Sequence, residues 1–253
     1  MHGLRWRPRA LGIGLIAFFA TFAPATQGQA GGRPAESPAA LANPAAVRCL
    51  PGPGATGSPR NIEDMVALIN SLPKPVSIPC VVESLDRPLH VFGTDSRASL
   101  QLSAGPSDPR LFIFKLPLII SVTTEGHGAS LLEVSVVQPG NRRSLKGELR
   151  FPLPDRVAHA LPYARIREGE GTACGFFCHG AEEQDPRIPF AEAFVSRAIR
   201  PSLSSEVGLD TLHRLKLECR PQANPQRCDL LRALLEHGEV QRQDFPAGMS
   251  EGF

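Results

Sequence analysis

Two cysteines and a histidine lie close enough together in this sequence to share one chemical task. Residues 172–180 read Thr-Ala-Cys-Gly-Phe-Phe-Cys-His-Gly, so three residues separate Cys174 from Cys178 and His179 follows at once. Thiol and imidazole groups at such spacing can bind a metal ion or hold a covalently attached cofactor, and the two thiols alone can form a disulfide. Residues 172–180 are therefore the first candidate site.

The segment resembles the haem-attachment motif of the c-type cytochromes, C-x-x-C-H, which is often continued by glycine. The resemblance covers about nine residues. It implies that Cys174 and Cys178 form thioether bonds to haem c and that His179 is the proximal ligand of the haem iron. This sequence departs from the pattern because three residues rather than two separate its cysteines. That difference changes how the thiols meet the haem vinyl groups.

Two other interpretations of the same residues stay open. In the first, Cys174 and Cys178 form a plain disulfide, His179 has no special role and no cofactor is bound. In the second, the three residues bind zinc with Glu182 or His159 as a fourth ligand. Adjacent cysteine and histidine ligands are unlike the usual two-and-two arrangement of structural zinc sites.

A haem would also need a distal ligand and an apolar pocket. The candidate distal ligands are Met65, Met249 and His213. The apolar residues that would line a pocket are Phe176, Phe177, Phe190, Phe194, Val195 and Ile199, with leucines that follow them in the chain. The same side chains would equally well form an ordinary core.

The start of the chain predicts export. Arg5, Arg7 and Arg9 precede an apolar run over residues 10–23, which is the order of charged and apolar regions in a secretory signal. Small residues offer cleavage after Ala25 or after Ala30, and we prefer the second because Pro24 lies within the first. Residues 1–30 are therefore predicted to be a signal peptide, and the mature protein to be periplasmic or secreted.

Charge and composition narrow the range of partners. Removal of residues 1–30 takes three arginines and no acid, so 27 basic residues against 25 acidic ones become 24 against 25. A nearly neutral chain with one Trp, one Tyr and no basic block does not favour nucleic-acid binding. We expect no stable membrane span after cleavage and a protein or redox partner whose identity the sequence does not define.

The remaining cysteines predict disulfides, because thiols in an oxidising compartment tend to pair. Proximity in the sequence favours Cys49 with Cys80 and Cys219 with Cys228. The second pair flanks a short turn between two predicted helices. Six cysteines allow 15 connectivities, so this pairing depends on proximity alone.

The rest of the chain divides by composition into a Pro/Gly-rich linker over residues 31–60, a β-rich domain over 61–155 and a helical region over 156–253. The predicted strands cover residues 76–85, 89–92, 99–102, 111–115, 118–123, 131–137 and 144–151. The predicted helices begin after Asn61, cover residues 190–199 and 209–219, and end with a helix that Asn224 caps. His127 is expected at the exposed tip of a hairpin.

These patterns predict an α+β fold in which an antiparallel sandwich-like or barrel-like domain precedes a helical C-terminal region. No catalytic set can be assembled from the scattered carboxylates and histidines, which favours a protein that is not an enzyme. The preferred function is an exported haem-c electron-transfer or accessory protein. The alternative is a non-enzymatic interaction protein whose cysteines are all structural.

Overall fold

The computed structural model describes residues 48–97, 101–168, 171–172, 180, 182–190 and 192–252. Its helices are α1 (Ile62–Ser71), α2 (Ile78–Glu83), η1 (His127–Ser130), α3 (Leu161–Ile166), η3 (Leu203–Ser205), α4 (Leu209–Leu217) and α5 (Pro225–Leu235). Its strands are β1 (Leu89–Thr94), β2 (Arg110–Lys115), β3 (Leu118–Thr123), β4 (Leu131–Val137), β5 (Arg143–Arg150), β6 (Arg167–Glu168), β7 (Gly171–Thr172), β8 (Glu183–Gln184), β9 (Phe194–Arg197), β10 (Ile199–Arg200), β11 (Glu206–Val207), β12 (Val240–Arg242) and β13 (Ser250–Glu251).

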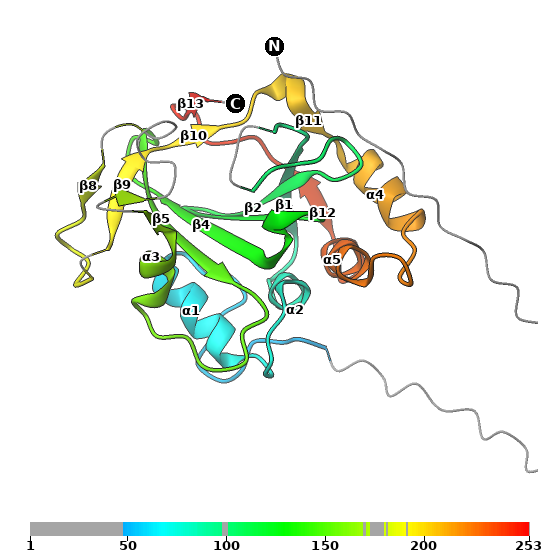
Figure 1. Cartoon of the computed structure of the whole chain (residues 1–253), viewed down its shortest axis with the longest axis horizontal. Helices are drawn as coiled ribbons and strands as arrows, with labels where there is room; N and C mark the ends of the chain where they lie inside the picture. Colours follow the sequence, from blue (N-terminus) through cyan, green and yellow to red (C-terminus); the bar gives the residue numbers. More distant parts are fainter. Residues whose placement is uncertain are drawn as a thin grey trace, which may run out of the picture. The chain divides into compact units, whose positions relative to one another are not determined.

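One nine-stranded sheet organises these elements. Figure 1 shows its strands lying side by side. Its strand order is β11-β1-β2-β3-β4-β5-β9-β8, and β12 lies beside β1. Neighbouring strands are antiparallel except for β1 and β12. The predicted α+β class is confirmed. The described sheet starts at β11 and ends at β8 without closing. It is therefore not a barrel, which was one of the two architectures predicted from the sequence.

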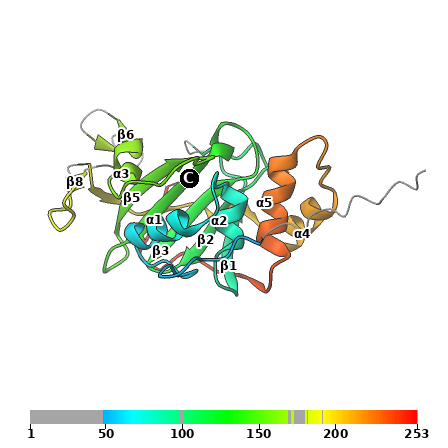
Figure 2. The ribbon, with the colours of Figure 1, turned by 90° about the horizontal axis from the view of Figure 1, so that it is seen from below.

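Helices pack on one face of the sheet, which we call the helical face (Figures 1 and 2). Side chains from α1, α2 and α5 form one apolar cluster there with alternate residues of the strands, such as Ile113, Ile120 and Val134. The opposite face, which we call the loop face, carries Phe92, Phe112 and Phe114 against Phe245 of the C-terminal segment. The Phe245 ring meets all three edge-on, with centroids 4.9 to 5.3 Å apart.

Helix α1 forms as its sequence predicts. The Asn61 side chain accepts a hydrogen bond from the Asp64 amide at 2.6 Å, which satisfies one of the unpaired amides of the first turn. Met65, Val66 and Ile69 are fully buried, as the apolar spacing indicates. The cap and the apolar stripe are both local signals, so the sequence alone was enough to find this helix.

The strand predicted over residues 76–85 is wrong, because most of this segment is helix α2. Ser77 caps the helix by accepting from the Cys80 amide, and Pro79 occupies the first turn, where its missing amide costs nothing. Val81 and Val82 favour a strand by propensity, yet both are buried in the helical-face core, and α2 packs against α5. Packing has overridden a weak local preference.

The helix predicted over residues 190–199 is also wrong, because this segment contains strands β9 and β10. Val195 lies in register with Leu145 of β5 on one side and with Glu183 of β8 on the other. Two flanking strands therefore pair with this segment, and the residues opposite Val195 are about 50 and 12 residues away in sequence. Helical spacing of apolar residues carries no information about such distant pairing.

The C-terminal region is less helical than expected. Helices α4 and α5 confirm the two last predicted helices, and the Asn224 side chain caps α5 by accepting from the Arg227 amide at 3.0 Å. Strands β8, β9, β11 and β12 come from the same region and extend the sheet. Residues on both sides of position 155 therefore share one sheet and one core.

The hairpin formed by β3 and β4 is confirmed, with Ile120 opposite Val134. His127 begins the short helix η1 at its tip and is exposed, as expected. Among the described residues, no helix has the length and apolar content needed to cross a membrane.

Candidate functional site

Cys174, Cys178 and His179 lie outside the described residues, so the haem, zinc and disulfide interpretations of this segment remain predictions. Described residues on both sides of this segment lie close to β9 or to the residues just before it. Arg167 of β6 forms an ion pair with Glu192 at 3.8 Å. Gly180 has a φ of +70°, and a Cβ at its position would lie 3.2 Å from the Arg197 guanidinium.

The residues proposed to complete a haem site are dispersed. Met65 is buried in α1 on the helical face, and Met249 packs with the aromatic cluster of the loop face. His213 is exposed on α4, which follows β11 at the opposite end of the strand order from β8. Phe190 packs against the Tyr163 ring with centroids 5.5 Å apart. Among the described residues, the three candidate distal ligands therefore lie in separate parts of the fold.

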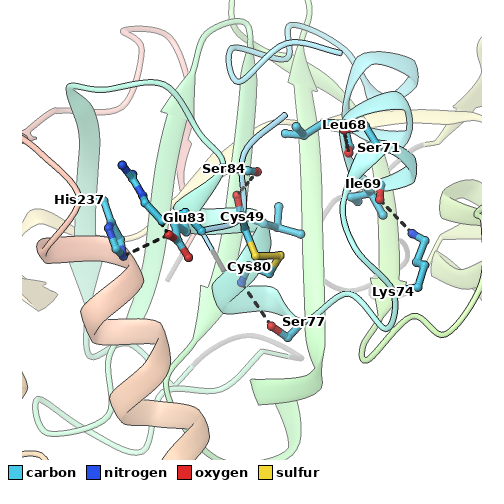
Figure 3. Close-up of a disulfide and its surroundings, with 12 residues drawn as sticks. Cys49, Leu68, Ile69, Ser71, Lys74, Ser77, Cys80, Glu83, Ser84 and His237 are labelled. Carbon is cyan, nitrogen blue, oxygen red and sulfur yellow. Dashed lines mark hydrogen bonds and ion pairs between the residues drawn. A yellow bond between two sulfur atoms is a disulfide. The ribbon is translucent and has the colours of Figure 1, made fainter. Parts of the chain in front are cut away.

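The other four cysteines form the two disulfides expected from proximity. Cys49 is bonded to Cys80 at the start of α2, as Figure 3 shows, and Cys219 is bonded to Cys228 between α4 and α5. A recess of about 400 Å³ lies beside the first disulfide, between α2 and α5. Glu83 in this recess contacts Arg48 at 3.3 Å and His237 at 3.7 Å. The first disulfide thus links the chain at Cys49 to helix α2 on the helical face.

Four ionisable side chains gather on the loop face, and we call this set the charged strip: Arg110, Glu133, Lys146 and Glu148. The strand registers put them on one face, because Phe112 lies opposite Ser121, Ser121 opposite Glu133, and Glu133 opposite Glu148. Successive side chains of a strand alternate between faces, so Arg110 joins Phe112 and Lys146 joins Glu148. The strip crosses β2, β4 and β5.

Arg110 is the most extensively hydrogen-bonded member of the charged strip. Its guanidinium donates to Glu133 at 2.7 Å and to the Ser121 hydroxyl at 2.6 Å, and it lies 4.7 Å from the centre of the Phe112 ring. Ser121 in turn donates to the Gln101 side chain at 2.6 Å. Burial lowers the pKa of Arg110, and Glu133 opposes that effect. The network keeps a buried cation and its carboxylate in fixed places.

Lys146 is buried beside this pair, with 8% of the residue exposed. Its ammonium donates to the Ser144 hydroxyl at 2.8 Å. Burial lowers the pKa of Lys146 to about 8; the charge of Glu133 opposes the shift, Arg110 adds to it, and Glu182 opposes it. Lys146 is therefore a lysine whose neutral amine is populated near neutral pH.

A second buried hydroxyl lies on the strand beside Ser144. Ser196 of β9 lies opposite Ser144 in the strand register, and it is fully buried. Its oxygen has no hydrogen-bond partner among the described residues. A buried polar group without a partner is unfavourable, so it is often retained at a site that binds something.

Glu148 lies directly across from Glu133 on the neighbouring strand. Burial raises the pKa of Glu148, the Glu133 carboxylate raises it further, and Arg150 and Arg165 act in the opposite direction. Glu148 is half-buried, and 20% of the Glu133 side chain is exposed. The two carboxyl groups therefore form the open side of the charged strip, whereas its two cations are buried.

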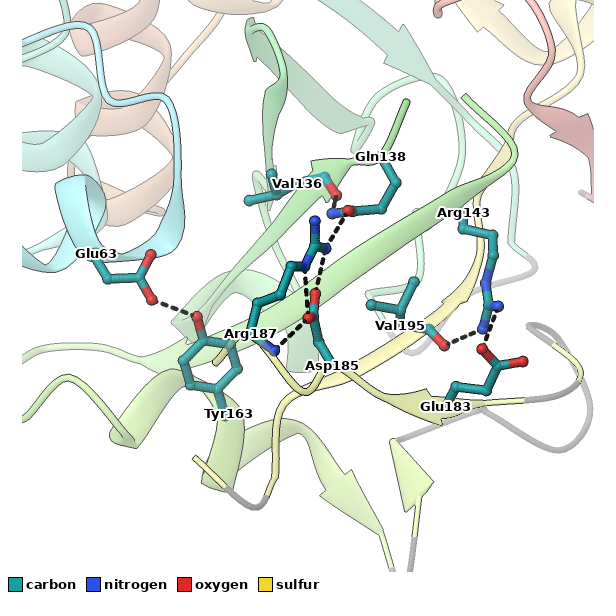
Figure 4. Close-up of polar contacts among 9 residues, drawn as sticks. All are labelled: Glu63, Val136, Gln138, Arg143, Tyr163, Glu183, Asp185, Arg187 and Val195. Carbon is teal, nitrogen blue, oxygen red and sulfur yellow. Dashed lines mark hydrogen bonds and ion pairs between the residues drawn. The ribbon is translucent and has the colours of Figure 1, made fainter. Parts of the chain in front are cut away.

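The segment around β8 is fastened beside the strip by the polar contacts in Figure 4. Arg143 of β5 donates to Glu183 at 2.8 Å and to the Val195 carbonyl at 2.9 Å. Asp185 is buried and accepts from the Arg187 guanidinium, which also donates to Gln138 at the end of β4. Arg187 lowers the pKa of Asp185. These bonds hold the chain after Gly180 against β4 and β5.

The charged strip was missed in the sequence because its signal is ambiguous. In β4 and β5, Glu133, Ser135, Lys146 and Glu148 occupy every second position. Such alternation normally marks the solvent-facing side of an antiparallel sheet. These side chains are buried because other segments of the chain cover the loop face, and a strand pattern does not show that covering.

Comparison with known proteins found no matching family model, curated protein or solved structure. The fold and the charged strip define an α+β protein that has two disulfides among its described residues and a buried charged cluster on one face of its sheet.

Proposed function

We propose that this protein is exported and acts as an interaction protein whose cysteines serve as structural disulfides. The observation that carries this proposal is the pairing of all four described cysteines, Cys49 with Cys80 and Cys219 with Cys228. Disulfides persist in oxidising compartments, and the charged and apolar order of residues 1–30 supports export to one. Both disulfides join helices to neighbouring segments, as expected of structural cross-links.

The test of this proposal is the intact mass of the protein exported from cells with its own residues 1–30. We expect an N-terminus at Gly31 and a mass six hydrogens below that of the reduced chain, because all six cysteines would be paired. An unprocessed N-terminus would contradict export. A free thiol after denaturation without reductant would contradict a purely structural role for the cysteines.

A covalent haem protein is the second candidate, and one observation favours it. Cys174, Cys178, His179 and Gly180 occur in the order of the cytochrome c attachment motif. The two cysteines and the histidine would hold haem c, which would supply an iron centre for one-electron transfer. Met65 on the helical face, Met249 on the loop face and His213 on α4 are the candidate distal ligands.

The same mass measurement, with a visible spectrum, separates the two candidates. It should be made on protein exported in cells that possess haem-attachment machinery. A mass gain of one haem would support the second candidate, provided that Cys174→Ala with Cys178→Ala abolishes it. The matched control, Cys219→Ala with Cys228→Ala, removes a disulfide and should leave any haem in place. Protein without haem would support the interaction protein.

A further inference from the structure

We propose that a groove at one end of the sheet binds an extended peptide segment that carries an apolar side chain beside a carboxylate. The groove lies where β2 turns into β3 and β4 turns into β5. This site rests on the proposed interaction function, for which it names the chemistry of the partner. Peptide binding is measured separately from export and from the disulfides, so the site can fail while the proposed function holds.

Four segments that are distant in the sequence form this groove, which we call the turn groove. Its volume is about 510 Å³. The β2–β3 turn, the β4–β5 turn, the C-terminal segment and the chain just before α1 all contribute to its lining. The lining residues that matter for binding are Arg60, Leu116, Pro117, Pro139, Asn141 and Pro246. The turn groove therefore exists only in the folded chain.

Contacts between these segments fix the walls of the turn groove. The Asn141 side chain donates to the Ala247 carbonyl at 2.9 Å, which ties the β4–β5 turn to the C-terminal segment. Phe245, just before Pro246, packs in the loop-face cluster with Val137 at the end of β4. Walls that are already in place lower the entropic cost of binding.

The turn groove exposes apolar surface. Leu116 is 39% exposed. Pro117, Pro139 and Pro246 each keep part of their surface exposed. Proline has no amide hydrogen, so these three residues offer ring carbons to a ligand rather than main-chain donors. A concave apolar surface of this kind favours an apolar side chain.

Arg60 gives the turn groove its charge. No other described residue of the lining is charged, so the groove carries one cation and no carboxylate. The Arg60 amide donates to Asp64 at 2.9 Å, but its guanidinium forms no hydrogen bond or ion pair with a described residue. A guanidinium can pair with a carboxylate through two parallel hydrogen bonds. Charge complementarity therefore favours a carboxylate on the ligand.

The recess between α2 and α5 lacks this feature, because its charges pair with one another. Arg48 and His237 both contact Glu83, and Arg232 pairs with Asp229. A ligand carboxylate there would have to displace a carboxylate of the protein. Of these two hollows, the turn groove is the one that offers an available cation.

A peptide matches the groups of the turn groove together. Within a few residues, an extended chain presents an apolar side chain, a neighbouring Asp or Glu, and main-chain N–H groups. The Asn141 side-chain oxygen has no donor among the described residues and can accept from such an N–H group. An alkyl carboxylate has no N–H group and would leave this oxygen without a partner. The groove is therefore complementary to a peptide.

The probe is the blocked tripeptide acetyl-Leu-Phe-Glu-amide, with acetyl-Leu-Phe-Gln-amide as its neutral counterpart. Each would be titrated into the isotope-labelled protein, and the backbone amide shifts of Leu116 and Asn141 would be followed by NMR. We expect saturable shifts at these residues with a Kd of about 1 mM. The Glu peptide should bind about threefold more tightly than the Gln peptide, since an exposed ion pair contributes modestly.

Two variants with matched controls assign the contacts. Arg60→Gln should remove the preference for the Glu peptide, whereas Arg220→Gln, in the exposed loop between α4 and α5, should keep it. Leu116→Ser should weaken the binding of both peptides about fivefold, because it removes apolar contact area. Leu203→Ser changes an equally exposed leucine outside the groove and should not weaken binding. Circular dichroism of each variant would establish that it is folded.

Absence of saturable shifts at Leu116 and Asn141 in the folded wild type would overturn the proposal. So would equal affinity for the two peptides. Tighter binding of octanoate at the same residues would assign the groove to alkyl carboxylates instead, and shifts that follow protein concentration alone would assign it to a second copy. These comparisons use the wild type, so they stand even where a variant folds poorly. A chain that is exported with all six cysteines paired and binds neither peptide would keep the proposed interaction function and lose this site.

Discussion

Glu133 and Glu148 face each other across β4 and β5, and yet their surroundings differ. Glu133 accepts a hydrogen bond from the buried Arg110 at 2.7 Å. Glu148, directly opposite on β5, is instead influenced by the positive charges of Arg150 and Arg165, which act to lower its pKa. Like charges directly opposite on a sheet are unfavourable. Arg110 therefore stabilises the Glu133 carboxylate, whereas burial and, next, the neighbouring Glu133 charge raise the pKa of Glu148.

This asymmetry predicts opposite effects for two equivalent substitutions. Glu148→Gln should stabilise the fold by about 0.5 kcal/mol at pH 7, since it removes a half-buried charge and its like-charge contact with Glu133, which solvent partly screens. Glu133→Gln should destabilise it by about 2 kcal/mol, because Arg110 would stay buried without its carboxylate. Urea unfolding at pH 7 measures both. Equal effects of the two substitutions would show that the environments are not distinct.

The pH dependence of Glu148→Gln follows from the sign of the shift. A raised pKa means that the folded state holds its proton more tightly, so wild-type stability falls as pH rises above the ordinary glutamate pKa of about 4.3. The gain from Glu148→Gln should therefore be absent near pH 3.5 and should grow as the pH rises through the raised pKa of Glu148. A gain that persists at pH 3.5 would point to packing rather than charge.

Lys146 should limit stability at neutral pH. Its pKa of about 8 lies below the ordinary value of 10.5, so the unfolded chain binds more protons between these values and stability should rise with pH across that range. Lys146→Met should stabilise the fold by about 1 to 3 kcal/mol at pH 7, with little gain at pH 10.5. Urea unfolding at both pH values tests this. Destabilisation at pH 7 would show that the Ser144 hydrogen bond outweighs the buried charge.

Tyr163 joins α3 to α1 through one hydrogen bond. The residue is fully buried, and its hydroxyl donates to Glu63 at 2.8 Å, as Figure 4 shows. Tyr163→Phe should lower the free energy of unfolding by about 1 kcal/mol, and Glu63→Gln should lower it by less because an amide oxygen can still accept. Tyr163→Ala is the packing control and should lose about 3 to 5 kcal/mol. A Phe variant as unstable as the Ala variant would contradict this division.

The two disulfides should differ in strength because they close loops of different length. Cys49 and Cys80 are 31 residues apart, and Cys219 and Cys228 are 9 apart. Restriction of the unfolded chain predicts about 3.7 kcal/mol for the first and about 2.7 kcal/mol for the second. Replacing each pair by alanines and measuring unfolding in urea tests the order. A larger loss for the Cys219–Cys228 pair would show that native-state packing, rather than loop length, governs.

Local signals explain which elements the sequence could predict. Asn61 and Asn224 cap helices within three residues of themselves, and the β3–β4 hairpin closes over a short turn. The pairs Cys49–Cys80 and Cys219–Cys228 follow from proximity. The caps and the hairpin are decided by interactions between residues near one another in the chain.

Long-range pairing explains the errors. Residues 78–83 are helical because Ser77 caps them and α2 packs on α5, and residues 194–197 are a strand because β5 and β8 lie beside them. In both segments the apolar pattern was compatible with the wrong structure. The free energy that decides between the two comes from partners that a local pattern cannot show.

The sequence by itself determined the α+β class, the capped helices and the central hairpin, because short-range contacts and composition decide them, and proximity in the sequence predicted the pairing of the four described cysteines. The tertiary structure alone decided that Arg110, Glu133, Lys146 and Glu148 form a site. Alternation of apolar and polar residues along a strand shows that its side chains point to two faces of the sheet. It does not show which of these faces other segments cover. Burial changes the pKa of a side chain only once other segments have removed its water, and those segments reach the loop face from distant parts of the chain.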